Sequence, residues 1–292
     1  MPSTIRETLL DAAKNFREAG VDSPRLSAEL LLAKAMGVER LTLIAYPERR
    51  LSDAELAAFA SLAERRAAGE PAAYILGEKE FFGRMFRVTR ATLIPRPETE
   101  LLVEAALEHP ALTGLTHVRF ADLGTGSGCI AATLCAERPG WAGLGIDLSD
   151  GALRTAAANA IRLGVRQRLS LIQADFTRPI LKSGSLDLVI SNPPYVSTPE
   201  YRGLSREIRD FEPASALIPG GLGAKSPDGL EYEAAVIRCA AQSLKPGGVL
   251  LIEHGWTQSE PLSLLLKNNS WKNIRYCKDL AQKDRYISAI RG

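Results

Sequence analysis

The chain has 292 residues, and 36 Lys and Arg against 34 Asp and Glu leave it a formal net charge of +2. A chain of this length can form one large domain or two modest ones, each with a hydrophobic core. Its charged fraction of 24% is ordinary for a folded protein and argues against disorder. The near-zero net charge argues against a protein that mainly grips nucleic-acid phosphates, although it leaves room for a local basic groove.

The sequence carries no sign of export, of a membrane span or of a metal site. Its start lacks the basic and then apolar segment of a signal peptide, and its apolar runs are far shorter than the roughly 20 residues that span a bilayer. The four cysteines form no CxxC pair and no cluster with histidine, so we expect neither zinc nor a disulfide framework, and a cytoplasmic location. These cysteines are Cys129, Cys135, Cys239 and Cys277.

The first part of the chain has the pattern of a helical bundle. Thr4 with Glu7, and Ser52 with Glu55, have the spacing of capping boxes ahead of apolar residues at helical intervals. The pattern predicts a small helical domain over residues 1–73. Up to position 75, ten basic against eleven acidic residues leave a net charge of −1. Such a domain is either a plain bundle or a docking platform for a protein partner, and its sequence does not decide between them.

A β-hairpin and an extended segment follow the predicted helices. Phe81 and Phe86 lie on either side of Gly83, as in a short hairpin, and prolines at positions 95 and 97 hold the chain extended. We expect residues 74–95 to link the helical domain to the rest of the chain.

From residue 96 to residue 292, apolar runs of strand length alternate with helical patterns. This alternation predicts an α/β domain whose sheet is mostly parallel, with right-handed crossovers and ligands at the carboxyl ends of the strands. The expected strands are 118–122, 143–147, 169–174, 186–191 and 248–253, and the expected helices are 130–137, 153–163 and 232–244.

A glycine-rich turn joins the first of these strands to a helix. In Gly124-Thr125-Gly126-Ser127-Gly128 the glycines alternate, so the backbone can turn sharply and approach a ligand closely. The helix that follows directs its free N–H groups at a carboxylate or phosphate. The spacing is GxGxG and does not match the GxGxxG fingerprint of dinucleotide-binding folds.

Two acidic residues end the next two strands. Asp147 lies about twenty residues past the glycines, where a carboxylate can accept both hydroxyls of a ribose. Asp175 could accept from an adenine amino group while Phe176 packs on the ring. For Asp175 a helix cap or a surface loop explains the residue equally well.

The segment Asn192-Pro193-Pro194-Tyr195 directly follows the fourth strand. Consecutive prolines make a rigid, extended elbow without free N–H groups, so their carbonyls are acceptors beside the Asn192 side chain. Acceptors next to an aromatic ring suit a planar NH2 on an sp2 centre, whose delocalised lone pair makes it a poor nucleophile. Hydrogen bonds to both N–H groups would orient that nitrogen for reaction.

Together these motifs resemble the class I S-adenosylmethionine-dependent methyltransferases that act on amide or exocyclic amino nitrogens. Within that class the chain closely resembles the HemK/PrmC family of release factor glutamine methyltransferases. The resemblance implies a Rossmann-like, mostly parallel seven-stranded sheet, an N-terminal helical substrate-docking domain and a β-hairpin linker. Further matches lie at Leu93–Glu100, Gly229-Leu230, Gly247-Gly248 and Glu253–Gly255.

The resemblance also implies the reaction, which is transfer of a methyl group from S-adenosyl-L-methionine to the glutamine amide nitrogen (N5) in the GGQ motif of class I peptide chain release factors. The product of the cofactor would be S-adenosyl-L-homocysteine. Gly124 to Gly128 would cradle the methionine end of the cofactor, Asp147 would bind its ribose, and Asp175 and Phe176 would lie at its adenine side.

The same resemblance assigns the substrate site to the segment after the fourth strand. Asn192, which would also border the cofactor, and the Pro193 carbonyl would accept the hydrogens of the glutamine amide. Pro194 and Tyr195 would shape the slot, which makes Asn192, Pro193 and Tyr195 the expected catalytic residues. Residues 96–100 would either border the pocket or act as a stiff strut.

Four alternatives compete with this interpretation. A DNA adenine-N6 methyltransferase would need a basic face to hold and flip its target, and a stable nucleic-acid partner is not expected here. A glutamine methyltransferase of a ribosomal protein would use the same chemistry. An inactive fold kept for binding would need neither Asn192 nor Pro193, and an NAD dehydrogenase is argued against by the glycine spacing.

Overall fold

The computed structural model describes residues 3–267 and 271–292. The chain divides into two units, one helical and one built on a sheet. The helical unit includes a stretch from the middle of the chain, which the sequence-based prediction assigns to the α/β domain of residues 96–292. The predicted boundaries at residues 73 and 95 stay predictions. The helical unit comprises Met1–Glu78 and Ser205–Phe211, and the sheet unit comprises Lys79–Leu204 and Glu212–Gly292.

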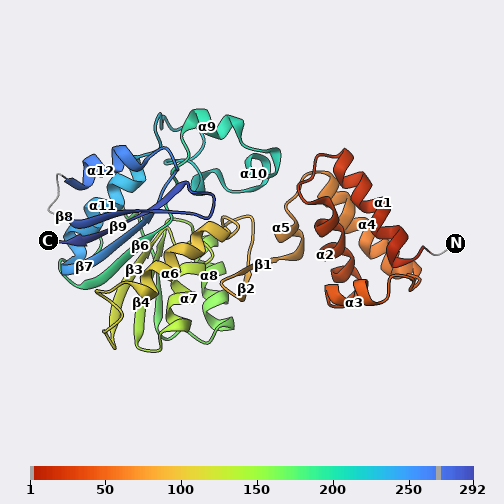
Figure 1. The fold of residues 1–292 in the computed structure, drawn as a ribbon, viewed down its shortest axis with the longest axis horizontal. Coiled ribbons are helices and arrows are strands. Elements are labelled where there is room, and N and C mark those ends of the chain that lie inside the picture. Colours follow the sequence, from red (N-terminus) through yellow and green to blue (C-terminus); the bar gives the residue numbers. More distant parts are fainter. Residues whose placement is uncertain (1–2, 268–270) are drawn as a thin grey trace. The chain divides into compact units, whose positions relative to one another are not determined.

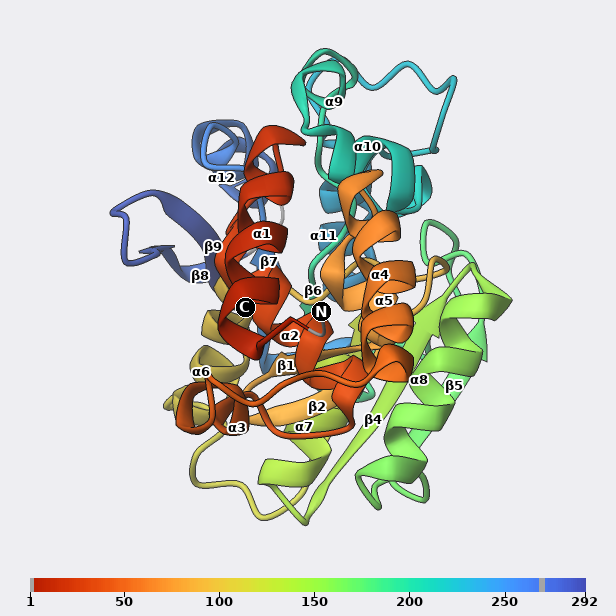
Figure 2. The same cartoon turned by 90° about the vertical axis from the view of Figure 1, so that its right-hand side faces the viewer.

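Three helices, α1, α2 and α4, form the body of the helical unit and lie side by side (Figures 1 and 2). The predicted capping boxes are confirmed: the Glu7 N–H donates to the Thr4 hydroxyl at 3.2 Å and the Thr4 N–H donates to the Glu7 carboxylate at 2.9 Å, and Ser52 and Glu55 pair likewise. Two further helices are too short to give a periodic signal in a sequence. The helices are α1 (Ile5–Glu18), α2 (Pro24–Met36), α3 (Arg40–Ala45), α4 (Asp53–Ala67) and α5 (Ala72–Leu76).

A buried arginine explains why the short helix α10 (Arg206–Phe211) belongs to the helical unit. Arg66 on α4 is only 2% exposed, and its Nη2 donates to Glu207 on α10 at 2.9 Å. Its Nη1 donates to the Glu70 carbonyl at 2.9 Å and its Nε to Ser27 at 3.3 Å. A buried guanidinium is costly unless its N–H groups are paired, so Glu207 supplies the anion that Arg66 requires.

The predicted hairpin is confirmed as β1 (Glu78–Phe81) and β2 (Arg84–Arg87). Phe82 and Gly83 turn the chain with φ values of 51° and 68°. The rings of Phe81 and Phe86 are buried edge to face with centroids 5.9 Å apart, and both belong to the hydrophobic core of the sheet unit. The hairpin is therefore anchored in the sheet unit.

In the described residues the sheet has seven strands in the order β5-β4-β3-β6-β7-β9-β8, and β9 runs in the direction opposite to the other six. This confirms the α/β fold with a mostly parallel seven-stranded sheet. Each of the five strands expected from the sequence is present. The strands are β3 (Val118–Leu123), β4 (Trp141–Asp147), β5 (Leu169–Gln173), β6 (Leu186–Ser191), β7 (Leu244–Glu253), β8 (Trp271–Lys278) and β9 (Asp284–Arg291).

Helices cover both faces of the sheet (Figure 1). Alternate residues of the central strands point to opposite faces: Phe120 and Leu188 pack with α6 and α7, whereas Ala121 and Val189 pack with α11 and α12. These helices are α6 (Glu100–Glu108), α7 (Cys129–Glu137), α8 (Asp150–Arg162), α11 (Glu231–Ser243) and α12 (Ser259–Lys267), with α9 (Thr198–Gly203) and the 3-10 turns η1 (Pro97–Thr99) and η2 (Ala214–Ala216) in the connections.

The strand order fixes where a ligand can bind. The central strand β3 lies between β4 and β6, and the helices that follow β3 and β6 cover opposite faces of the sheet. Because the connections leave these two neighbouring strands toward opposite faces, a crevice forms at the carboxyl ends of β3 and β6. Within the described residues, no helix combines the length and the apolar character needed to cross a membrane.

Glu233 near the start of α11 is a buried carboxyl group for which the described part of the chain shows no ion pair. Its side chain is fully buried, and neither carboxylate oxygen has a hydrogen-bond partner among the described residues. Burial raises the pKa of Glu233 from 4.5 to about 9. The folded protein therefore holds this proton over a pH range in which the unfolded chain releases it, so this group lowers the free energy of unfolding as the pH rises.

Glu233→Gln, which copies the neutral acid, should leave the melting temperature nearly unchanged at pH 5 and raise it at pH 9 relative to the unmodified chain. The reason is that the substituted chain no longer loses a proton on unfolding. Thermal unfolding followed by circular dichroism over this pH range measures the difference, and Glu260→Gln, at an exposed site on α12, is the control. Parallel pH dependences for all three chains would contradict the assignment.

Candidate active site

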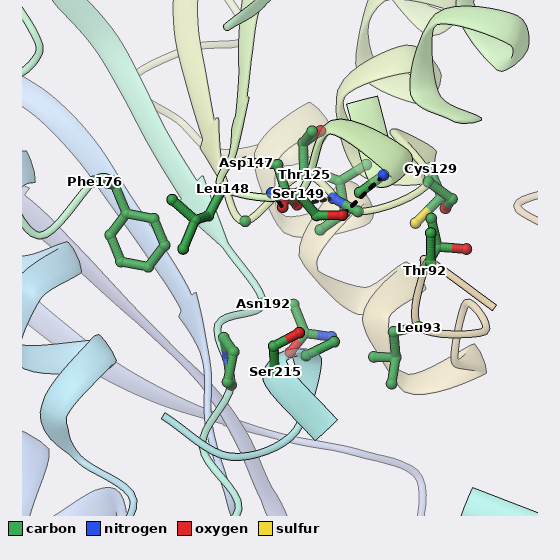
Figure 3. A pocket seen from close by; sticks show the side chains of 18 of the residues that line it. Thr92, Leu93, Thr125, Cys129, Asp147, Leu148, Ser149, Phe176, Asn192 and Ser215 are labelled. Atoms are coloured by element: carbon green, nitrogen blue, oxygen red, sulfur yellow. Dashed lines mark hydrogen bonds between the residues drawn. The ribbon is translucent and has the colours of Figure 1, made fainter. Parts of the chain in front are cut away.

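A cavity of about 280 Å³ lies at the carboxyl ends of β3, β4, β5 and β6. Figure 3 shows Phe176 on one side of it, Leu93 on the other, and Asn192 across the cavity from Asp147. The predicted site residues on its wall are Gly124, Thr125, Gly126, Ser127, Asp147, Asp175, Phe176, Asn192 and Pro194, whereas Gly128, Pro193 and Tyr195 are not among the described residues that line it.

The glycine turn has the backbone that its sequence requires. Gly124, Gly126 and Gly128 have φ values of 75°, 55° and 76°, which other residues adopt only with strain. Gly128 has a packing role as well, since a Cβ there would lie 3.0 Å from the Cβ of Ala156 on α8. The structure thus assigns Gly128 to helix packing, and its contact with a cofactor stays a prediction.

Two carboxyl groups, the buried Asp122 and the partly buried Asp147, hold this turn. Asp122 at the end of β3 accepts from the Thr125 hydroxyl at 2.7 Å, and burial raises the pKa of Asp122 to about 7. Asp147 at the end of β4 accepts from the Gly126 N–H and the Ser149 N–H, both at 2.9 Å. Burial also raises the pKa of Asp147. Each oxygen of Asp147 accepts only one of these bonds, so lone pairs remain for the hydroxyls of a ligand.

Asp175 closes a local turn and also borders the cavity, while its contact with a ligand stays a prediction. Its carboxylate accepts from the N–H and the hydroxyl of Thr177 at 2.9 and 2.7 Å, which closes a local turn and lowers its pKa. The same residue also lines the cavity. Beside it, the rings of Phe176 and of Tyr232 from α11 meet edge to face, with centroids 5.5 Å apart.

The segment after β6 brings Asn192 to the cavity wall, whereas Tyr195 is not among the described residues that line it. The Asn192 Nδ2 donates to the Thr99 hydroxyl oxygen at 3.0 Å, and Thr99 donates to Glu253 Oε2 at 2.7 Å. The Tyr195 hydroxyl donates to Glu253 Oε1 at 3.3 Å. Burial raises the pKa of Glu253 to about 7, and burial together with the Glu253 carboxylate raises the pKa of Tyr195.

The segment that contains Arg96 both borders the cavity and is braced. Pro95, Arg96 and Thr99 line the cavity. The Arg96 guanidinium lies 2.5 Å from Glu212 Oε1, and the other oxygen of Glu212 accepts from the Ile94 N–H at 3.0 Å. The carboxylate of Glu212 is almost wholly buried, so this ion pair fixes the segment against the sheet unit.

Sequence patterns did not identify several residues of the wall. Ser149 follows Asp147 by two positions and caps α8, so its place after the acidic residue is a usable signal. Tyr232 and Ser215 reach the cavity from segments with no local motif, and only the fold brings them there. Glu253 lies in the segment Glu253–Gly255 that resembles the family, but nothing in the sequence indicates that it is linked to Asn192 through Thr99.

Gly229 holds the loop that follows Asn192 in place. Its φ is 76°, and a Cβ there would lie 2.1 Å from the Tyr195 carbonyl oxygen and 2.9 Å from Gln258 Nε2. Gln258 itself donates to the carbonyls of Tyr195 and Asp228 at 3.0 and 2.8 Å. This region therefore has no room for a side chain at position 229.

Gly229→Ala should destabilise the protein clearly more than Gly223→Ala. Gly223 has a similar φ of 88°, but an added Cβ there would meet open space. Its substitution should therefore lower the free energy of unfolding only by the backbone strain, about 1–2 kcal/mol. Urea unfolding of both variants separates the strain from the steric clash. Equal losses in the free energy of unfolding would show that the Tyr195 loop moves freely out of the way.

Comparisons with known proteins agree with this geometry. A family model described as PrmC N-terminal domain matches residues 7–77, and one described as methyltransferase domain matches residues 120–213. The solved structure of the hMettl16 catalytic domain superimposes with a TM-score of 0.53 at 19% sequence identity, covering 79% of this chain and 80% of that one. It therefore shares the fold.

Curated relatives match the chain over nearly its whole length. The release factor glutamine methyltransferase of Nitratidesulfovibrio vulgaris is 50% identical and covers 99% of this chain and 96% of its own. The protein of the same name from Cereibacter sphaeroides is 42% identical over 97% of each chain. With its helical unit, its parallel sheet and its cavity at the ends of the central strands, the chain belongs to the release factor glutamine methyltransferase family.

Proposed function

We propose that this protein transfers the methyl group of S-adenosylmethionine to the side-chain amide nitrogen of the glutamine in the GGQ motif of a class I peptide chain release factor. Because release factors act during translation termination, the proposed site of action is the cytoplasm. The observation that carries the proposal is the position of Asn192, which lies on the wall of the same cavity as Asp147 and the glycine turn.

The groups around the cavity suit the three parts of S-adenosylmethionine. The backbone of Gly124 to Ser127 is bare enough to approach the charged methionine end. Asp147 keeps acceptor sites for two ribose hydroxyls, and the Phe176 ring and the Asp175 carboxylate match the face and the amino group of adenine. When bound, the cofactor supplies an electrophilic methyl group on its sulfonium.

The protein's own contribution is to hold and orient the amide. A glutamine amide nitrogen is a weak nucleophile because its lone pair is delocalised into the carbonyl. Acceptors at Asn192 and at the Pro193 carbonyl would bind its two hydrogens and fix the direction of that lone pair. The roles of Pro193 and Tyr195 rest on the family resemblance, since neither is among the described residues that line the cavity.

The alternatives weighed from the sequence are less well supported. A ribosomal-protein glutamine would need the same amide chemistry, but the relatives at 42% and 50% identity carry the release factor name. A DNA adenine target would call for a basic binding surface, whereas residues 1–75 have a net charge of −1, from ten basic and eleven acidic residues.

Incubation with S-adenosylmethionine and an unmethylated class I release factor should add one methyl group to the GGQ glutamine. Peptide mass spectrometry would locate the modification. A release factor in which this glutamine is replaced by alanine is the matched control and should stay unmodified. Methyl transfer to duplex DNA or to ribosomal proteins, with none to the release factor, would refute the proposal.

Asn192→Ala should lower the rate of methyl transfer by about 100-fold or more while leaving the affinity for S-adenosylmethionine within about threefold, because the side chain is proposed to act on the amide. Single-turnover rates and calorimetric titration of the cofactor measure the two effects. A parallel loss of cofactor affinity would mean that Asn192 belongs chiefly to the cofactor site.

A further inference from the structure

Asn192 stands at the end of a chain of hydrogen bonds that the proposed reaction does not explain. Its Nδ2 donates to Thr99 Oγ1, and Thr99 donates to Glu253 Oε2. The other oxygen of Glu253 accepts from the Tyr195 hydroxyl. Thr99 is 2% exposed and Glu253 is 1% exposed, so water does not compete for these bonds.

The direction of this chain is set by Glu253. Burial raises the pKa of Glu253 to about 7, so above neutral pH this group is mainly the carboxylate, which only accepts hydrogen bonds. In that state the Thr99 hydroxyl gives its single proton to Glu253. The Thr99 oxygen can then only accept, so the Asn192 side chain must present its NH2 group to Thr99. The Oδ1 of Asn192, for which the described residues offer no donor, is left as the free end of the amide.

The two ends of an asparagine amide have nearly the same shape but opposite hydrogen-bonding character. If Thr99 were free to donate, the amide could turn over and offer its NH2 group where an acceptor is needed. Such a reversed amide would repel the N–H groups of a substrate amide. Shape alone does not select the reactive orientation.

We propose that Glu253, acting through Thr99, is a positioning residue that holds Asn192 in the orientation in which Oδ1 accepts from the substrate amide. This inference rests on the proposed function for its consequence in catalysis. The hydrogen-bond direction itself does not depend on the substrate. Residues from three separate elements take part, since Thr99 ends η1, Glu253 ends β7 and Asn192 follows β6.

Thr99→Val keeps the shape of the side chain and removes the hydroxyl, and Thr99→Ser keeps the hydroxyl. We expect Thr99→Val to lower the single-turnover rate of methyl transfer about 10-fold or more, with unchanged cofactor affinity, because the acceptor loses its fixed direction. Thr99→Ser should restore the rate to within about threefold of the unmodified chain. Thr133→Val, at a buried threonine on α7, is the control for the substitution itself and should leave the rate unchanged.

A double-substitution cycle tests whether Glu253 acts through Thr99. Glu253→Met alone should lower the rate as Thr99→Val does, and adding it to Thr99→Val should cost less than about twofold more. If the two losses instead multiply in the double variant, Glu253 acts by another route and the proposal is overturned. An unmodified rate in either Thr99→Val or Glu253→Met would overturn it as well.

Nuclear magnetic resonance supplies a measurement that needs no substrate. The side-chain NH2 signal of Asn192, assigned by its loss in Asn192→Asp, should shift in Thr99→Val and Glu253→Met and stay in place in Thr99→Ser. An unchanged signal in Thr99→Val would overturn the proposal. This readout does not depend on methyl transfer. If the protein failed to methylate a release factor, the proposed function would be refuted, but the nuclear magnetic resonance signals would still show whether Thr99 and Glu253 orient Asn192.

Discussion

The site depends on the reversal of strand order at the centre of a parallel sheet. Because the connections from β3 and β6 leave toward opposite faces, the carboxyl ends of these two neighbouring strands stay uncovered by a crossover helix. The glycine turn follows one of them and Asn192 follows the other. Groups for a cofactor and groups for an amide therefore meet in one cavity although nearly seventy residues separate them in the chain.

Carboxyl groups under this edge are buried, which gives the site its electrostatic character. Asp122 and Glu253 each have a pKa raised to about 7, and both accept from a threonine hydroxyl. Burial of a charge is costly, and directed hydrogen bonds recover part of that cost while they fix the partner's proton. The threonines Thr125 and Thr99, which line the cavity, in turn hold the glycine turn and Asn192, so the two buried carboxyl groups orient the groups that face the cavity.

Local patterns predicted the parts of the molecule that depend on local physics. The capping boxes, the hairpin, the five parallel strands and the glycine turn all follow from the spacing of a few residues, and the family and its reaction followed from the motifs. Tyr232, Ser215 and the partnership of Thr99 with Glu253 could not be predicted in this way, because their positions are set by tertiary packing between segments far apart in the sequence. The catalytic roles of Pro193 and Tyr195 stay predictions.

The return of Ser205–Phe211 to the helical unit has a consequence for any attempt to take the protein apart. The chain crosses between the units three times, so no single cut in the backbone separates them. A fragment that begins after residue 78 would still contain Glu207 and Phe211, but it would lack Arg66 and Gly69, against which they pack. The helical unit therefore cannot be exchanged as one continuous segment. A chimaera with a related protein would have to replace residues 1–78 and 205–211 together.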